Sequence, residues 1–213
     1  MTRQQLIEQI TREVYGTQPN DDASITPNLI NQMINQGVGL VVKQNYKEAV
    51  QLDGVGYVNN SFYSTFKGIA VVADDNFLWK ITLPQIPIAI GKNEGISTLQ
   101  FKSKGKGGEV SRPAIWLSQD QVTYFQSLQQ PPTKIIAYSQ GEFVYAASSL
   151  ILNQYTATIT IISGGNSADL SSTLNVPDDY IPGIVDYVTK LLMLSRQQVQ
   201  DNANDGIDAI RTV

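Results

Sequence analysis

The sequence contains no cysteine and no histidine. Without cysteine there can be no disulfide, no thiolate zinc site and no cysteine nucleophile. Without histidine the chain lacks the most common general base, the most common metal ligand and every Ser-His-Asp triad. An enzyme would have to work with carboxylates, Lys, Tyr or Ser alone. We therefore expect a protein that is not an enzyme and that uses no cofactor.

Long apolar runs and an excess of positive charge are also missing. No run reaches the roughly 18 apolar residues of a membrane-spanning helix, and the N-terminal segment MTRQQLIEQITREVYG is too charged for a secretory signal. The net charge of −4 disfavours wrapping a nucleic-acid backbone over a large surface. Most polar residues are uncharged, with abundant Gln and Asn, which we interpret as a surface for packing and hydrogen bonding with neighbours.

Helical periodicity appears at both ends of the chain. The first helix is expected over Thr2–Tyr15, where Thr2 and Gln5 have the spacing of a capping box. A second begins at the N-cap Thr26 with Pro27 in the first position and runs to about residue 48. Gly37 and Gly39 interrupt its apolar face, which indicates either a close helix crossing or a kink. A third helix is expected over 182–200.

Glycine, aromatic and β-branched residues dominate the middle of the sequence. Two strands around a turn are expected in residues 64–84, a hairpin turning at Gln140-Gly141 in residues 134–148, and a half-buried strand at 156–163. The segment LPQIPIAI, residues 83–90, carries two prolines and suits an edge strand or an extended connector.

These patterns predict an α+β fold. The N-terminal helix pair and the long C-terminal helix are expected to pack together, and the central antiparallel β-rich region is expected to form a sandwich or a barrel. There is no repeat and no long linker, so we predict one unit, with a helical part at 1–50 plus 176–213 and a β-rich insertion at 51–175.

The most distinctive short stretch is QFKSKGKGGEVSRP, which carries Lys102, Lys104 and Lys106. It is not a phosphate-binding P-loop, because Gly105-Lys106 is followed by Gly107 and no helix begins after it. We interpret residues 102–108 as a finger between two strands. It is either a solvated loop or a contact to DNA or to a partner, and its lysines would give a salt-sensitive attraction to phosphate without sequence readout.

Other motif-like strings fail on spacing or context. Ser64 and Lys67 match S-x-x-K by letter but lie in a strand-like segment, where residues i and i+3 point to opposite faces. Residues 201–212 lack two required ligands of a calcium loop, because Ala203 offers no side-chain oxygen and Thr212 stands where a bidentate Glu is needed. The many aromatic residues of the middle fit a sheet core better than a sugar-binding face.

The order of these segments resembles a known family. The strings that carry the resemblance are TRQQLIEQITREVYG, DDASIT, WKITLPQIPIAIGKNEGIS and VPDDYIPGIVDYVTKLLMLSRQQVQDNANDG. They are similar to head-to-tail connector proteins, also called ring or adaptor proteins, of tailed bacteriophages, especially crAss-like short-tailed phages. The resemblance covers nearly the whole chain. It lies in the residue types and the order of the segments and includes no chemically diagnostic motif.

The resemblance implies a virion structural protein at the head-tail interface, made in the cytoplasm of the bacterial host. About a dozen copies would form a ring that docks on the portal protein, continues the DNA channel and binds tail or other ring proteins. DNA would pass without sequence specificity, and no membrane would be involved. The alternatives are another virion component, such as a capsid decoration or tail protein, or a carbohydrate-binding or glycosidase module.

Overall fold

The computed structural model describes residues 1–16, 25–75, 77–90, 95–103, 110–127, 132–165 and 168–204, with residues 126–127 and 195–204 described by their backbone only. Helices and two β-sheets in these residues confirm the α+β class. The chain divides into two compact units, Met1–Ser61 with Gly164–Val213, and Phe62–Ser163. The sequence pattern had placed the boundaries near residues 50 and 175. We call the two units the helical unit and the β unit.

Helix α1 spans Arg3–Tyr15 and begins as the sequence predicts. The Thr2 hydroxyl accepts a hydrogen bond from the Gln5 backbone N–H at 3.3 Å, and the Gln5 side-chain oxygen accepts one from the Thr2 N–H at 2.9 Å. This reciprocal capping box satisfies two backbone donors that an α-helix leaves unpaired. The apolar face of α1 is buried and consists of Leu6, Ile7, Ile10 and Val14.

Helix α2 spans Pro27–Asp53 and is longer than expected. The Thr26 hydroxyl caps it by accepting a hydrogen bond from the Leu29 N–H at 3.3 Å. It ends where Gly54 adopts a left-handed conformation, with φ of 70°, and donates its N–H to the Val50 carbonyl at 3.0 Å. Glycine takes this conformation at little cost, so Gly54 defines the end of the helix.

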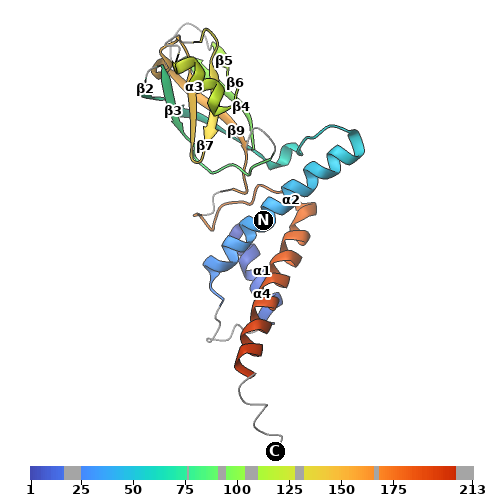
Figure 1. The fold of residues 1–213 in the computed structure, drawn as a ribbon. Coiled ribbons are helices and arrows are strands. Elements are labelled where there is room, and N and C mark those ends of the chain that lie inside the picture. Colours follow the sequence, from blue (N-terminus) through green and yellow to red (C-terminus); the bar gives the residue numbers. More distant parts are fainter. Residues whose placement is uncertain are drawn as a thin grey trace, which may run out of the picture. The chain divides into compact units, whose positions relative to one another are not determined.

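Helix α4, Ile181–Asn204, follows a short 3-10 turn, η4 (Asp178–Tyr180), and packs against α1 and α2 (Figure 1). At the crossing with α2, a Cβ on Gly37 would lie 3.1 Å from Cγ2 of the buried Ile184. A Cβ on Gly39 would meet nothing within 4 Å. Of the two interpretations of Gly37, the close helix crossing is therefore the one observed.

A fully buried arginine lies at the start of α1. The Arg3 guanidinium donates to the Asn31 side-chain oxygen of α2 at 2.8 Å and to the Gly164 carbonyl at 2.6 Å. No carboxylate among the described residues forms an ion pair with it. Burial lowers the pKa of Arg3 because the charged form loses hydration. The hydrogen bonds to Asn31 and Gly164 therefore offset part of the hydration free energy that the guanidinium loses on burial.

The β unit contains two sheets (Figure 1). The antiparallel four-stranded sheet has the order β1 (Tyr63–Ala70), β9 (Tyr155–Ile162), β4 (Ile96–Ser103) and β5 (Ser111–Pro113). The five-stranded sheet has the order β2 (Val72–Asp75), β3 (Leu78–Thr82), β8 (Phe143–Ala147), β7 (Ile136–Gln140) and β6 (Ile115–Trp116). Short 3-10 turns, η1 (Asn60–Phe62) and η3 (Leu152–Gln154), precede β1 and β9.

Apolar side chains from both sheets meet in one core. Ala157, Ile159 and Ile161 of β9 are fully buried and alternate with threonines, as expected for a strand with one face inward. Val144 and Ala146 of β8 belong to the same cluster from the other sheet. No described strand pairs across the two sheets, so the β unit is a sandwich rather than a closed barrel.

Two features of the β unit differ from the sequence analysis. Helix α3, which spans Gln119–Ser127 in the β unit, was not predicted. Its fully buried Val122 packs against Ile136 and Tyr138 on the outer face of the five-stranded sheet. The prediction of an entirely antiparallel region is wrong for β6 and β7, which pair in parallel. The cause is the crossover through α3, since parallel neighbours cannot be joined by a tight turn.

Other local predictions are confirmed in part. The β7–β8 hairpin is present and turns at Gly141-Glu142, one residue later than expected. Strands β2 and β3 pair, but residues 64–84 also contain most of β1, Asp74 and Asp75 belong to β2, and Asn76 lies outside the described residues. The proline-containing segment 83–90 forms no strand and is an extended connector, in which the Ile88 N–H donates to the Ile162 carbonyl at 2.9 Å. Strands β4 and β5 flank the lysine-rich finger as an antiparallel pair.

The glycine positions of α2 give a matched stability test. We expect Gly37→Val to lower the free energy of unfolding by about 1–3 kcal/mol, because the added methyl groups overpack the crossing at Ile184. Gly39→Val introduces the same side chain into open space and should change stability by less than about 0.5 kcal/mol. Chemical denaturation followed by circular dichroism would measure both; equal losses would contradict the close crossing.

The buried arginine gives a second test. Arg3→Ala should lower the free energy of unfolding by about 2–5 kcal/mol, because it leaves a cavity and removes the donors to Asn31 and Gly164. Arg3→Met keeps most of the volume and should lose less. Arg12→Ala, on the exposed side of the same helix, should stay within about 0.5 kcal/mol of the parent. Thermal and chemical denaturation measure these differences. Equal stability of the Arg3→Ala and Arg12→Ala variants would contradict a structural role for the buried Arg3 side chain.

Candidate functional site

An open groove of about 510 Å³ runs between α1 and α4 on the helical unit. The α1 side contributes Met1, Gln9 and Glu13. The opposite side is formed by the start of α4 and the turn before it, through Asp178, Ile181, Pro182, Val185, Asp186 and Thr189. Ile181 and Val185 give the groove an apolar floor, and Glu13, Asp178 and Asp186 surround it with carboxylates.

We call Glu13, Asp178 and Asp186 the rim of the groove, and neighbouring groups offset only part of their negative charge. Glu13 accepts hydrogen bonds from the Gln9 amide at 3.1 Å and from the Thr189 hydroxyl at 3.4 Å. Asp186 pairs with Lys190 at 2.6 Å, and both side chains are well exposed. Lys190 offsets one of these three carboxylates, which leaves the groove with an excess of negatively charged side chains. A solvated ion pair of this kind contributes little to stability, so its main effect is on what the groove attracts.

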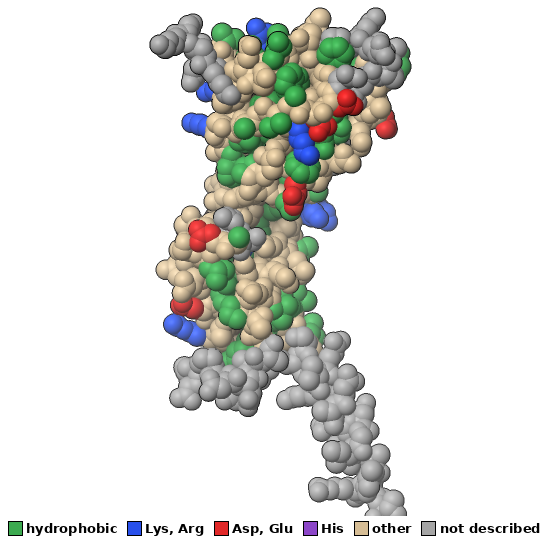
Figure 2. Space-filling model, turned by 90° about the vertical axis from the view of Figure 1, so that its left-hand side faces the viewer, with side chains coloured by type: hydrophobic (Ala, Val, Ile, Leu, Met, Phe, Trp, Pro, Cys, Tyr) green, Lys and Arg blue, Asp and Glu red, His purple; other side chains and the backbone are tan. Residues whose placement is uncertain are grey.

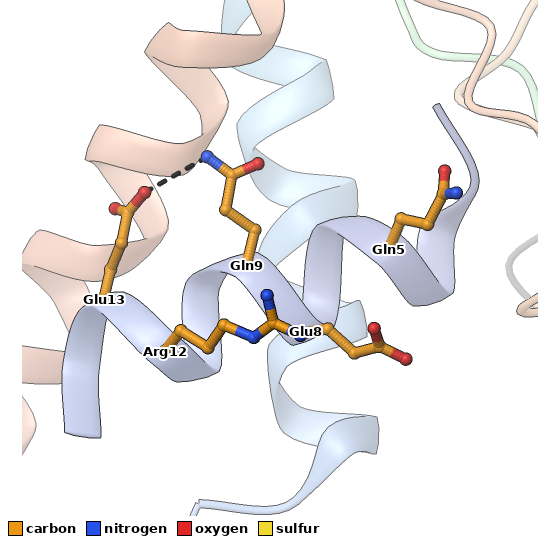
Figure 3. Close-up of a pocket in the computed structure, with 5 residues that line it drawn as sticks. All are labelled: Gln5, Glu8, Gln9, Arg12 and Glu13. Carbon is orange, nitrogen blue, oxygen red and sulfur yellow. Dashed lines mark hydrogen bonds between the residues drawn. The ribbon is translucent and has the colours of Figure 1, made fainter. Parts of the chain in front are cut away.

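A second hollow of about 450 Å³ adjoins the groove along the outer face of α1. Its lining side chains all project from this one helix and are Gln5, Glu8, Gln9, Arg12 and Glu13 (Figure 3). Gln9 and Glu13, which are hydrogen-bonded to each other, line both hollows. Because all the described residues that line it come from one helix, this hollow presents a polar surface and does not enclose a ligand.

The groove has features of a docking surface. Among the residues that the structure describes, no group of three or more acidic side chains is arranged to hold a metal ion. On the face drawn in Figure 2, charged side chains are scattered among apolar and uncharged polar ones. An apolar floor with a negative rim is complementary to a protein segment that carries apolar side chains beside positive charge.

The last turns of α2 form a second exposed surface on the helical unit. The Asn45 amide donates to the Tyr180 hydroxyl at 2.8 Å, next to the start of α4. The residues of α2 after Asn45 therefore extend beyond the start of α4 by about 12 Å, at 1.5 Å per residue. Lys47 and Val50 lie in this part and share one exposed face of α2 with Lys43, which lies just before it.

The last residues of α2 and the chain just beyond it also carry exposed apolar side chains. Leu52 is 83% exposed and Val55 is 64% exposed. The Tyr57 hydroxyl donates to the Asp53 carboxylate at 2.6 Å, and this hydrogen bond raises the pKa of Tyr57. The bond holds the segment after Gly54 back against the helix end. We refer to Lys43, Lys47, Val50, Leu52 and Val55 as the α2 end.

The lysines singled out in the sequence do not lie in the helical unit. Lys102 is in β4, opposite Ser111 of β5 and Thr156 of β9. Lys104 and Lys106 lie outside the described residues. The finger therefore begins on a paired strand, and its role as a DNA or partner contact stays a prediction.

Neither the groove nor the α2 end was predicted from the sequence. Glu13 and Asp178 are far apart in the sequence, so only the packing of α1 on α4 brings them to one groove. For the α2 end a signal was present, since the i, i+4, i+7 spacing of Lys43, Lys47 and Val50 defines one helical face. It was missed because the helix was expected to end near residue 48.

The sequence matches no protein-family model and no curated protein. The suggested relation to connector proteins therefore remains a prediction. None of the helices in the described part of the chain combines the length and apolar character needed to cross a membrane.

The finger can be tested separately from the groove. Replacing Lys102, Lys104 and Lys106 with Ser should leave the fold intact, with a melting temperature within about 2 °C of the parent. If the finger contacts DNA or a neighbouring subunit, particle assembly or genome ejection should decline. Unchanged assembly and ejection would show that the finger is only a solvated loop.

Proposed function

We propose that the chain is a virion structural protein, a subunit of a head-to-tail connector ring that docks on the portal and continues the DNA channel toward the tail. The observation that carries the proposal is the pair of exposed surfaces on the helical unit, the acidic groove and the lysine-bearing α2 end. Two different open surfaces on one compact unit suit a protein that contacts several neighbours at once.

The composition supports the same function. Because histidine and cysteine are missing, the chain lacks the usual catalytic and metal-binding groups. Its polar residues are mostly uncharged, which suits surfaces that neighbours bury without stranding charges. A net charge of −4 suits a channel through which DNA slides without adhering.

The proposal assigns the following contacts. About twelve copies form a closed ring. In each copy α1, α2 and the long C-terminal helix pack together and face the portal or the adjacent subunits. The β sandwich forms ring contacts or carries the next tail or ring protein. The finger at residues 102–108 contacts a neighbour or the passing DNA, without sequence specificity. The site of action is the head-tail interface of the virion, after synthesis in the host cytoplasm.

Quantitative mass spectrometry on purified particles of the encoding phage tests this function. The chain should be present at about a dozen copies per particle, counted against the major capsid protein. Hundreds of copies would instead indicate a capsid decoration protein. Absence from the particle would contradict any virion role, and the carboxylates of the groove would then be tested for glycan binding on an array and for glycoside hydrolysis, which requires two carboxyl groups across a cleft.

A further inference from the structure

The two exposed surfaces of the helical unit are complementary in charge. The groove presents Glu13, Asp178 and Asp186, with Lys190 as the only cation that forms an ion pair with them among the described residues. The α2 end presents Lys43 and Lys47, for which no ion pair is found among the described residues. Opposite charges on separate surfaces favour contact between copies, because a copy that offers its α2 end also offers a groove.

The two surfaces are also complementary in apolar character. The floor of the groove contains Ile181 and Val185, and the α2 end carries Val50 on the same face as its two lysines. Lys43 and Val50 are about 10 Å apart along the helix, at 1.5 Å per residue. A helical segment of this length spans two turns, so it can place an apolar side chain on the floor while its lysines reach the rim.

We propose that the α2 end of one copy docks into the α1–α4 groove of a second copy of this chain. Lys43 and Lys47 face Glu13 and Asp178 of the second copy, and Val50 packs on Ile181 and Val185. The contact joins two different surfaces, so each copy can engage two neighbours, and it closes into a ring if the rotation between copies allows. For its biological setting this inference rests on the connector function proposed above.

Charge reversal on the two surfaces tests the contact in both directions. Variant one carries Lys43→Glu and Lys47→Glu, and variant two carries Glu13→Lys and Asp178→Lys. Each variant alone opposes like charges at the contact, so its self-association should weaken at least tenfold relative to the parent. An equal mixture restores opposite charges at every contact and should associate as the parent does. Sedimentation velocity and native mass spectrometry at concentrations up to about 1 mM, which populates even a weak contact, measure this.

The matched control applies the same residue changes to the β unit. Lys67→Glu and Glu142→Lys alter exposed residues there and should leave association unchanged. Circular dichroism verifies that all variants fold. A parent that stays monomeric over this range, a mixture that stays dissociated, or control variants that weaken association as much as the groove variants would each overturn the proposal. A different partner in the groove, such as a basic helix of another protein, would then be the occupant to seek.

Disulfide trapping tests which surfaces meet. The chain has no cysteine, so introduced cysteines are the only thiols. Val50→Cys and Gln9→Cys should form a mixed disulfide when the two single variants are combined and oxidised, since Gln9 lines the groove. Gln32→Cys, exposed on α2 away from the groove, is the control partner. Equal trapping of Val50→Cys by the two partners would contradict the proposed docking.

The two proposals fail separately. If the mixed variants do not associate but particles contain about a dozen copies, the connector function stands and the subunits meet through other surfaces. If the variants behave as expected but particles contain none, the chain self-assembles and its function lies outside the virion.

Discussion

The buried guanidinium of Arg3 is the interaction on which the helical unit depends. It joins α1 to Asn31 of α2 and to Gly164, the residue at which the chain returns from the β unit. A buried cation without a carboxylate partner is stable only while its hydrogen bonds are held in place. The return segment also contributes directly to the start of α1, because the Ser172 and Leu170 carbonyls accept the N–H groups of Arg3 and Gln4 at 3.1 and 2.9 Å. The first turn of α1 is therefore completed by residues some 170 positions later.

This arrangement explains where the groove lies. The return segment pairs with the chain start, through the bridge between Thr2 and Thr173 and the bond from the Leu174 N–H to the Met1 carbonyl at 3.1 Å. A few residues later the chain enters η4 and α4, so the start of α4 is brought beside α1. Gly37 then lets α4 approach α2 closely, at Ile184. With α4 fixed between these two contacts, its exposed side and α1 become the two walls of the groove.

How far the sequence predicted this structure depended on the range of the interactions involved. The caps at Thr2 and Thr26 were predictable because each involves residues three positions apart. For Gly37 the sequence left two interpretations open, a close helix crossing or a kink. It could not decide between them, because the deciding contact is with Ile184, which is distant in the sequence. Helix α3 was missed because, among its described side chains, only Val122 is fully buried, and one buried position gives no clear period. Arg3 appears in the sequence as an ordinary charge near a terminus, and nothing local indicates that it is buried. The groove could not be predicted for the same reason, since its walls come from opposite ends of the chain.

The buried and the exposed charges of the helical unit have different roles. The buried charge stabilises the fold, and the exposed charges are accessible to a partner. The deeply buried charge, Arg3, serves the interior and has no freedom to bind anything else. The exposed charges of the groove and of the α2 end contribute little to folding, because solvated ion pairs are weak. The position of Lys43 and Lys47 on one face of a helix that extends beyond its own bundle therefore has no explanation in the stability of the helical unit. Charge of this kind has its effect when it meets a surface of opposite sign, by orienting the encounter and by excluding partners of like charge. The groove supplies such a surface on every copy of the chain, which is why a contact between copies accounts for both features with a single interaction.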